Sequence, residues 1–132
     1  MASVSRPRVL LVDDLETNRF LLEEALGEIG ADIVSVGAGK RALEIVSASH
    51  PEVVVLDFQM PDLNGAEVAR RIKLEPGAPF TYIVLMSGYQ EAEQTATIRE
   101  SLADRFLGKP YKLSEIRSAV EEGLRIAADR RG

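Results

Sequence analysis

The sequence contains no cysteine, and no apolar run approaches the length that is needed to span a bilayer. Without cysteine, the protein cannot form disulfides, thiolate metal sites or a catalytic Cys nucleophile. The segment Met1–Arg8 has no apolar stretch of the kind found in signal peptides. The one histidine, His50, is expected on a surface loop. These absences favour a protein of the cytoplasm without a membrane partner.

An excess of positive charge is also missing. The chain has 16 Lys and Arg against 21 Asp and Glu, so its net charge is −5, and no basic stripe stands out. A nucleic-acid partner is therefore not expected. With 132 residues, 45% of them hydrophobic and 28% charged, the composition is that of one soluble globular domain. We expect the core of this domain over about residues 7–128, a frayed tail at 129–132, and no output domain.

Five short aliphatic runs alternate with segments of helical periodicity. The runs that predict strands are Val9–Val12, Ile33–Val36, Val53–Leu56, Tyr82–Met86 and Arg105–Gly108. The helices are marked by Leu22–Ile29, Leu43–Val46, Val68–Ile72, Glu91–Leu102 and Leu113–Ala127, with stops at Gly30 and at His50-Pro51. Strand–helix pairs of this length favour an α/β fold, a single doubly wound five-stranded parallel sheet flanked by five helices.

The third run ends in an acid. Val53–Leu56 is aliphatic enough for a strand that is buried on both faces, and Asp57 follows it directly. Pro61 prevents a simple continuation of the strand, and residues 62–65 have the composition of a turn. An acid at this end of a central strand lies where open α/β sheets place their ligand sites. Burying it is costly unless the carboxylate is solvated, paired or bound to a metal.

Polar residues follow four of the five expected strands. The acidic pair Asp13-Asp14 follows the first, Asp57 the third, Ser87 the fourth and Lys109 the fifth. Taken singly, each has an ordinary explanation as a turn residue, a helix cap or a solvated charge. Because the carboxyl ends of parallel strands meet at the same edge of a sheet, the five side chains are expected to lie together.

Such a group of side chains suits phosphoryl transfer to an aspartate. Two carboxylates about 4 Å apart repel by about 4 kcal/mol at an effective dielectric near 20, and a hard divalent cation removes that repulsion. A site made of oxygen ligands, with few of them from the protein, suits Mg²⁺. The Ser87 hydroxyl and the Lys109 ammonium group would bind phosphoryl oxygens, and Asp57 would be the nucleophile.

At these residues the chain resembles the receiver domain of response regulators, the phospho-acceptor module of two-component signalling. The resemblance covers essentially the whole chain and implies the flavodoxin-like strand order 2-1-3-4-5. The motifs that carry it, in family order, are Asp13-Asp14, Asp57 with Met60-Pro61 and Gly65, Ser87, Phe106, and Lys109-Pro110.

The resemblance also assigns roles to residues. It implies that Asp57 is phosphorylated by a histidine kinase or a histidine phosphotransfer protein. Asp14, Asp57 and the backbone carbonyl of Gln59 would hold Mg²⁺, and Asp13 would assist through water. A cis bond between Lys109 and Pro110 would aim the lysine into the site.

Three positions depart from the commonest family pattern. Ser87 stands where Thr is commoner, Phe106 stands where Tyr is common, and Ser101-Leu102-Ala103 replaces a Gly-Ala stretch. None of them removes a group that phosphorylation requires. Family geometry further places Gln59 and Tyr89 beside the water that hydrolyses the acyl phosphate, so both are expected to tune its lifetime.

The expected output surface is the face formed by the fourth helix, the fifth strand and the fifth helix. Phosphorylation would draw Ser87 toward the new oxygens and let the Phe106 ring turn inward. This change is expected to regulate a downstream protein partner or a phosphorylation-dependent dimer of an otherwise monomeric chain. The residues expected on this face are Tyr89, Gln90, Tyr111 and Lys112.

Several alternatives remain open. Thr17-Asn18-Arg19 and Gln59-Met60-Pro61 look most like receivers fused to hybrid histidine kinases, so the chain is either a free-standing regulator or a phosphorelay domain from such a kinase. A Mg²⁺-dependent aspartyl-phosphate phosphatase needs an acid at position 59, where this chain has Gln. A flavin mononucleotide binder would place its phosphate where Asp13-Asp14 repels it. A module that is never phosphorylated usually lacks some of the residues that are present here.

Overall fold

Strands and helices alternate from Arg8 to Arg131 in the computed structural model, which describes residues 6–88 and 95–132. The strands are β1 (Arg8–Val12), β2 (Asp32–Val36), β3 (Val53–Asp57), β4 (Tyr82–Ser87) and β5 (Arg105–Gly108). The helices are α1 (Glu16–Leu26), α2 (Gly39–Ser49), α3 (Gly65–Leu74), α4 (Thr95–Glu100) and α5 (Leu113–Arg131). The predicted α/β alternation is therefore confirmed.

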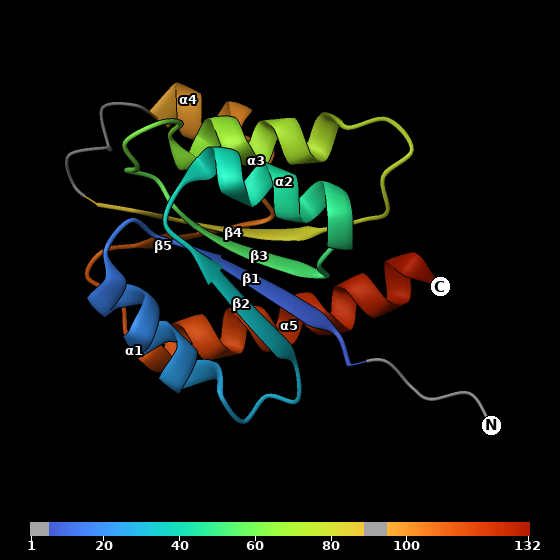
Figure 1. Cartoon of the computed structure of the whole chain (residues 1–132), viewed down its shortest axis with the longest axis horizontal. Helices are drawn as coiled ribbons and strands as arrows, with labels where there is room; N and C mark the ends of the chain where they lie inside the picture. The colour runs from blue at the N-terminus through green and yellow to red at the C-terminus, as the bar shows by residue number, and fades with distance from the viewer. Residues whose placement is uncertain (1–5, 89–94) are drawn as a thin grey trace.

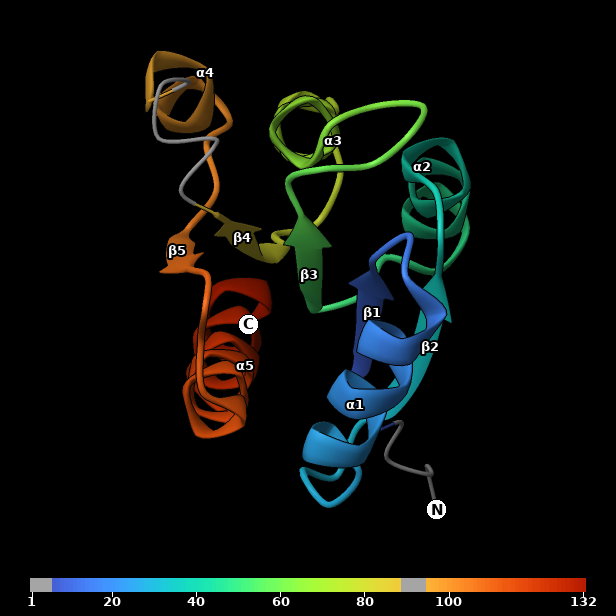
Figure 2. The same ribbon diagram turned by 90° about the vertical axis from the view of Figure 1, so that its left-hand side faces the viewer.

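The strands form one parallel sheet in the order β2-β1-β3-β4-β5, as predicted. Helices α1 and α5 cover one face of this sheet, and α2, α3 and α4 cover the other (Figures 1 and 2). From β1 the chain passes through α1 to β2, and after β2 it changes face and returns through α2 past β1 to β3, so the direction of strand order reverses between β1 and β3. Ligands bind at such a reversal in doubly wound sheets, beyond the carboxyl ends of the strands.

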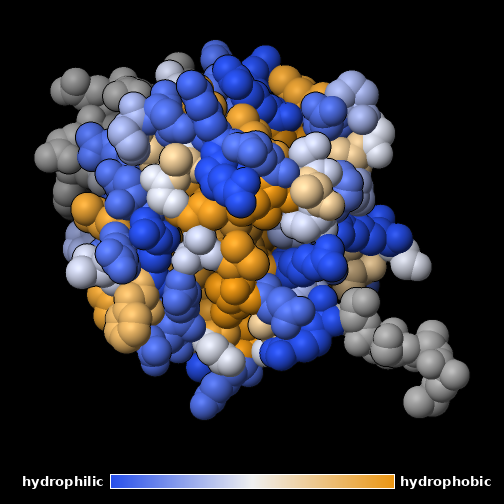
Figure 3. All heavy atoms as spheres, in the orientation of Figure 1, coloured by the Kyte–Doolittle hydropathy of each residue, from blue (hydrophilic) through white to orange (hydrophobic). Residues whose placement is uncertain are grey.

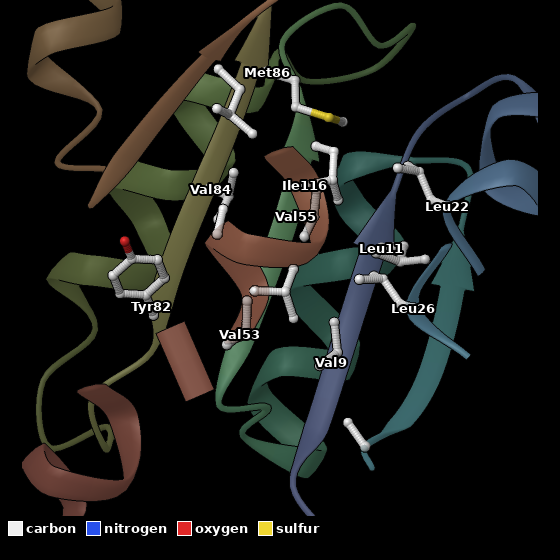
Figure 4. Close-up of a cluster of buried hydrophobic side chains, with 14 residues drawn as sticks. Val9, Leu11, Leu22, Leu26, Val53, Val55, Tyr82, Val84, Met86 and Ile116 are labelled. Atoms are coloured by element: carbon white, nitrogen blue, oxygen red, sulfur yellow. The ribbon is translucent and has the colours of Figure 1, made fainter. Parts of the chain in front are cut away.

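The core consists of two apolar layers, one on each face of the sheet. All five residues of β3 are buried, and they alternate between the layers because successive side chains of a strand point to opposite faces. Val53 and Val55 pack with Ile116 of α5 and Leu22 of α1 (Figure 4). At the β2 edge of the sheet the cover is thinner, and an apolar strip is exposed over β2 and α2 (Figure 3). Val34 of β2 is 51% exposed.

Helix α1 is one turn shorter than the sequence predicted. It ends at Leu26, and the predicted last member of its apolar stripe, Ile29, lies in the turn that follows, where its N–H donates to the Leu26 carbonyl at 3.3 Å. Ile29 still packs against the core from this turn. Gly30 has φ of +80°, a conformation that glycine adopts at no steric cost, and it marks the end of the turn rather than of the helix.

Helix α5 is longer than predicted, and the expectation of a frayed tail at 129–132 was wrong. The helix continues to Arg131, whose guanidinium donates to the carbonyls of Phe80 at 2.7 Å and Pro51 at 2.9 Å. These carbonyls precede β4 and β3, so Arg131 ties the end of the chain to the start of two strands. Contacts across 51 and 80 residues leave no local sequence signal.

The segment that replaces the family's Gly-Ala stretch has a defined path. Ser101 is buried, and its hydroxyl donates to the Ile98 carbonyl at 2.5 Å and accepts from the Ala103 N–H at 3.2 Å. Between them, Leu102 has φ of +65°. An L-residue with a side chain rarely adopts this left-handed conformation, and glycine adopts it freely. Of the predicted helix Glu91–Leu102, residues 91–94 lie outside the described residues and α4 ends at Glu100.

Candidate functional site

Backbone hydrogen bonds between neighbouring strands continue past the strand ends and fix the residues that follow. The N–H of Asp13 donates to the Val36 carbonyl at 3.1 Å. The N–H of Phe58 donates to the Met86 carbonyl at 2.8 Å, and the N–H of Lys109 donates to the Ser87 carbonyl at 2.8 Å. The residues that follow β1, β3 and β5, and the end of β4, therefore lie at one edge of the sheet, on the left in Figure 1. The predicted meeting of these residues follows from this register.

Three carboxylates come together at this edge. One oxygen from each of Asp13, Asp14 and Asp57 lies within 4.8 Å of the others. Asp13 and Asp57 are 0% and 3% exposed, whereas Asp14 is open to solvent. Oxygens of this number, charge and spacing fit a hard divalent cation, and the exposed Asp14 provides a route by which it can enter.

The Asp57 carboxylate is repelled by the neighbouring acids and attracted by Lys109. The Lys109 ammonium group donates to Asp57 Oδ1 at 2.5 Å. Burial raises the pKa of the Asp57 carboxyl, and the nearby charges of Asp13 and Asp14 raise it further, while Lys109 opposes both effects. Burial by itself lowers the pKa of Lys109, but the hydrogen bond to Asp57 and its charge outweigh burial, so that pKa is raised. The peptide bond between Lys109 and Pro110 is cis, as expected.

Asp13 is fixed from the start of α1. Its Oδ1 accepts from the Leu15 N–H at 2.9 Å, and its Oδ2 accepts from Asn18 Nδ2 at 3.3 Å. Arg19 donates to the Asp13 backbone carbonyl at 2.6 Å. From the sequence, Asn18 and Arg19 were expected only as part of a family likeness, and their support of the acidic pair was not predicted. Both residues lie near the start of the helix that follows Asp13-Asp14, and this position in the sequence could have indicated that they contact the acidic pair.

Gln59 lies on a hollow beside the acids. The hollow has a volume of about 330 Å³ and is lined by Asp14 and by residues of the loop between β3 and α3, namely Phe58, Gln59, Met60, Pro61 and Asn64. Asp14 and Gln59, two of the residues expected at the metal, thus face the same space. Tyr89, the other residue expected to tune the lifetime, lies outside the described residues, as does Gln90.

The start of α3 is pressed against Asp57. A Cβ on Gly65 would lie 2.3 Å from the Asp57 carbonyl oxygen, so only glycine fits there. The Gly65 N–H donates to the Phe58 carbonyl at 2.8 Å, and the Asn64 side chain caps α3 by accepting from the Glu67 N–H at 2.8 Å. The glycine that the sequence marked as a turn residue is therefore required by a close backbone approach.

The remaining predicted residues come from the end of β4, from β5 and from the segment that follows β5, and they differ in exposure. Ser87 ends β4 beside Gly108, half-buried, and Phe106 of β5 is 44% exposed. Lys112 is exposed and Tyr111 half-buried. Burial, and then the negative charge of Asp13, raise the pKa of the Tyr111 phenol. Tyr111 therefore interacts electrostatically with the acidic residues. From the sequence, Tyr111 was expected only on the output surface.

Comparison with known proteins gives consistent matches. Residues 9–121 match the family described as the response regulator receiver domain. The chain is 36% identical over 119 residues to the autoinducer 1 sensor kinase/phosphatase LuxN of Vibrio campbellii. It is 30% identical over 122 residues to sporulation initiation phosphotransferase F of Bacillus subtilis. The signal receiver domain of an HD domain-containing protein from Pseudomonas fluorescens Pf-5 superposes with a TM-score of 0.86 at 25% identity, covering 99% of this chain and 96% of that one.

The matches cover this chain more fully than they cover some of the relatives. The chain aligns over 89% of its own length with 14% of LuxN. A transcriptional regulator, ycf27 of Porphyridium aerugineum, is 31% identical and is covered to 50% of its length. Phosphotransferase F is covered to 97%. The chain thus spans half or less of several curated relatives that it matches. Among the described residues, no helix has the length and apolar character that crossing a bilayer requires.

Proposed function

The chain belongs to the response regulator receiver domain family, and from that premise we propose that Asp57 accepts a phosphoryl group from a histidine kinase or a histidine phosphotransfer protein. The observation that carries the proposal is the arrangement around Asp57. A carboxylate that is 3% exposed lies within 4.8 Å of two others and bonds to one lysine at 2.5 Å. Such a group has the charge and the neighbours that a phosphoryl acceptor needs.

The donor set fits Mg²⁺. Asp14, Asp57 and the backbone carbonyl of Gln59 would hold the ion, and Asp13 would assist through water. When bound, Mg²⁺ neutralises the carboxylates and the oxygens of the transferring phosphoryl group. Asp13 suits the indirect role because both of its carboxylate oxygens already accept hydrogen bonds, one from Leu15 and one from Asn18.

The residues of the chain perform the transfer as follows. A carboxylate oxygen of Asp57 forms a bond to phosphorus while the phosphorus–nitrogen bond of the phosphohistidine breaks, and the departing imidazole nitrogen keeps the electron pair. Lys109 loses its charged partner as Asp57 becomes an acyl phosphate, and its ammonium group turns to a phosphoryl oxygen. The Ser87 hydroxyl, at the end of the neighbouring strand, donates to another oxygen.

We further propose that the α4-β5-α5 face carries the output. Phosphorylation adds roughly −1.5 to −2 charge beside Asp57, and Lys109 directly follows β5 while Ser87 ends the adjacent strand β4. The Phe106 ring, 44% exposed, can gain apolar burial by turning inward. A downstream protein or a second copy of the chain would bind the altered face. Amide NMR with beryllofluoride tests this: shifts at Phe106 and across β5 support it, and shifts confined to the acids would leave the domain as a relay.

A role as a phosphorelay intermediate is the second candidate. It is supported by the similarity to a sensor kinase/phosphatase and to a phosphotransferase. The phosphatase alternative is disfavoured, because Gln59 lies on the hollow beside Asp14 and its amide cannot protonate a leaving group.

The proposal is tested by intact-mass measurement after incubation with acetyl phosphate, with and without Mg²⁺. The wild type should gain one phosphoryl group only with Mg²⁺, and Asp14→Ala should gain little. Asp32→Asn is the matched control, because Asp32 is an exposed carboxylate at the opposite end of the sheet and should label like the wild type. Equal labelling of wild type and Asp14→Ala would contradict the assignment of the metal site.

A further inference from the structure

The loop between β3 and α3, residues 58–64, is anchored by backbone hydrogen bonds of Phe58 and by the side chain of Asp62. At the start, the Phe58 N–H donates to Met86 and the Phe58 carbonyl accepts from Gly65, both at 2.8 Å. Gln59 and Pro61 are exposed and line the hollow next to Asp14. Because Gln59 and Pro61 are exposed, the position of their backbone depends on the contacts of the next residue, Asp62.

The Asp62 carboxylate is bound to the first turn of α2. Oδ1 accepts from the Gly39 N–H at 3.0 Å and Oδ2 from the Lys40 N–H at 2.8 Å. Oδ1 also accepts from the N–H of Leu63 at 2.8 Å. The residue at the N-cap position of α2 is Ala38, which has no side-chain acceptor and makes no cap bond. Asp62 supplies the cap that Ala38 cannot, from a position 23 residues beyond Gly39 in the chain.

A second observation shows that α2 and this loop are packed without spare room. A Cβ on Gly39 would lie 2.8 Å from Val68 Cγ2, 3.1 Å from Leu63 Cβ and 3.3 Å from the Leu63 carbonyl oxygen. Glycine at position 39 thus permits the close approach that the Asp62 hydrogen bonds require. A methyl group there would push α2 away from the loop and stretch those bonds.

We infer that Asp62 is a positioning residue for the metal site, which holds the Gln59 backbone carbonyl in place by fastening the loop to α2. The inference rests on the proposed role of that carbonyl as a Mg²⁺ ligand. Residues that orient a metal ligand from behind typically change metal affinity by 10–100-fold when they are removed. Because Asp62 acts on one carbonyl ligand and leaves the carboxylates in place, we expect the low end, about tenfold weaker Mg²⁺ binding in Asp62→Ala.

The test separates metal affinity from the capacity for phosphorylation. Mg²⁺ is titrated by amide NMR, and the initial rate of labelling by acetyl phosphate is measured against Mg²⁺ concentration. Asp62→Ala should need about tenfold more Mg²⁺ for half its maximal rate but reach nearly the wild-type rate at saturation. Asp62→Asn, which keeps one acceptor oxygen, should fall between them. A purely structural defect would lower the saturated rate without this shift.

Asp104→Ala is the matched control. It also removes a carboxylate that accepts a backbone N–H, from Ile83 at 2.7 Å, and in addition an ion pair with Lys73 at 2.6 Å, but it lies before β5, away from the metal edge. All titrations are made at about 0.15 M ionic strength, where charges are screened beyond about 8 Å. Gly39→Ala should reproduce the Asp62→Ala shift, and the double variant should show little more than either single one, since both break the same contact.

Each outcome decides the inference. A wild-type Mg²⁺ dependence in Asp62→Ala, an equal shift in Asp104→Ala, or additive effects of Asp62→Ala and Gly39→Ala would overturn it while the wild type still labels with Mg²⁺. If the wild type itself neither binds Mg²⁺ nor labels, the proposed function fails, and this inference fails with it. If Asp62→Ala does not fold, the intermediate shift predicted for Asp62→Asn decides the question.

Discussion

Replacing Asp57 by asparagine is expected to raise the free energy of unfolding of the metal-free protein. Asn has nearly the same shape and keeps an oxygen that can accept from Lys109. It removes the buried negative charge that Asp13 and Asp14 repel. The change thus exchanges an ion pair in a crowded acidic site for a neutral hydrogen bond.

The magnitude follows from the opposing charges. At an effective dielectric near 20, a like charge at the 4.8 Å limit costs about 3.5 kcal/mol, so at that separation Asp13 and Asp14 together repel Asp57 by about 7 kcal/mol. On the same scale Lys109, at 2.5 Å, attracts Asp57 by about 7 kcal/mol. The two nearly cancel, and the cost of burying a carboxylate, several kcal/mol, remains. Lys109 is 32% exposed and can turn to water, so we expect a net gain of about 1–3 kcal/mol.

The gain should depend on pH in a defined direction. Because the pKa of Asp57 is raised above 3.8 in the folded state, folding is favoured when the carboxyl is protonated. Below the unfolded pKa the variant and the wild type should be equally stable. The difference should open as pH rises through the folded pKa, and it should be fully present at neutral pH.

Urea unfolding at neutral pH without Mg²⁺, followed by circular dichroism, measures the effect. Thermal unfolding should shift upward by about 3–5 °C for each kcal/mol. Asp62→Asn is the control of opposite sign: backbone hydrogen bonds, first that of Lys40, lower the pKa of Asp62 to about 2, so its charge stabilises the fold above the unfolded pKa. A less stable Asp57→Asn protein, or a gain that persists at saturating Mg²⁺, would refute the reasoning.

Three further changes test other parts of the structure. Leu102→Gly should raise stability by about 0.5–1 kcal/mol in urea unfolding, because Leu102 is 44% exposed and has φ of +65°; no gain over Leu102→Ala would contradict this. Arg131→Ala should lower stability by about 1–3 kcal/mol, because the Phe80 carbonyl loses its donor and the Pro51 carbonyl keeps only the Thr81 hydroxyl at 3.2 Å; an unchanged urea midpoint would argue against a stabilising role of Arg131. Tyr89→Ala should shorten the half-life of the acyl phosphate by admitting water, whereas a half-life equal to or longer than that of the wild type would rule out shielding.

The sequence was sufficient for those features that depend on local pattern. The aliphatic run before Asp57 identified the central strand, and parallel strands necessarily bring Asp13, Asp57 and Lys109 to one edge. The features it could not predict depend on contacts between distant segments. The Asp62 cap on α2 spans 23 residues and the Arg131 contacts span 51 and 80 residues. Contacts between such distant segments produce no local sequence pattern from which they could be predicted. The early end of α1 was missed because Ile29 stays in the core from a turn.

The central claim is that Asp57 is the phosphoryl acceptor. The most direct test treats the protein with acetyl phosphate and Mg²⁺, reduces it with borohydride, and maps the product by peptide mass spectrometry. Borohydride converts an aspartyl phosphate to homoserine and leaves an unmodified carboxylate unchanged. The account predicts homoserine at position 57, and none in Asp57→Asn. Homoserine at position 13 or 14 in the wild type, or none anywhere, would contradict it.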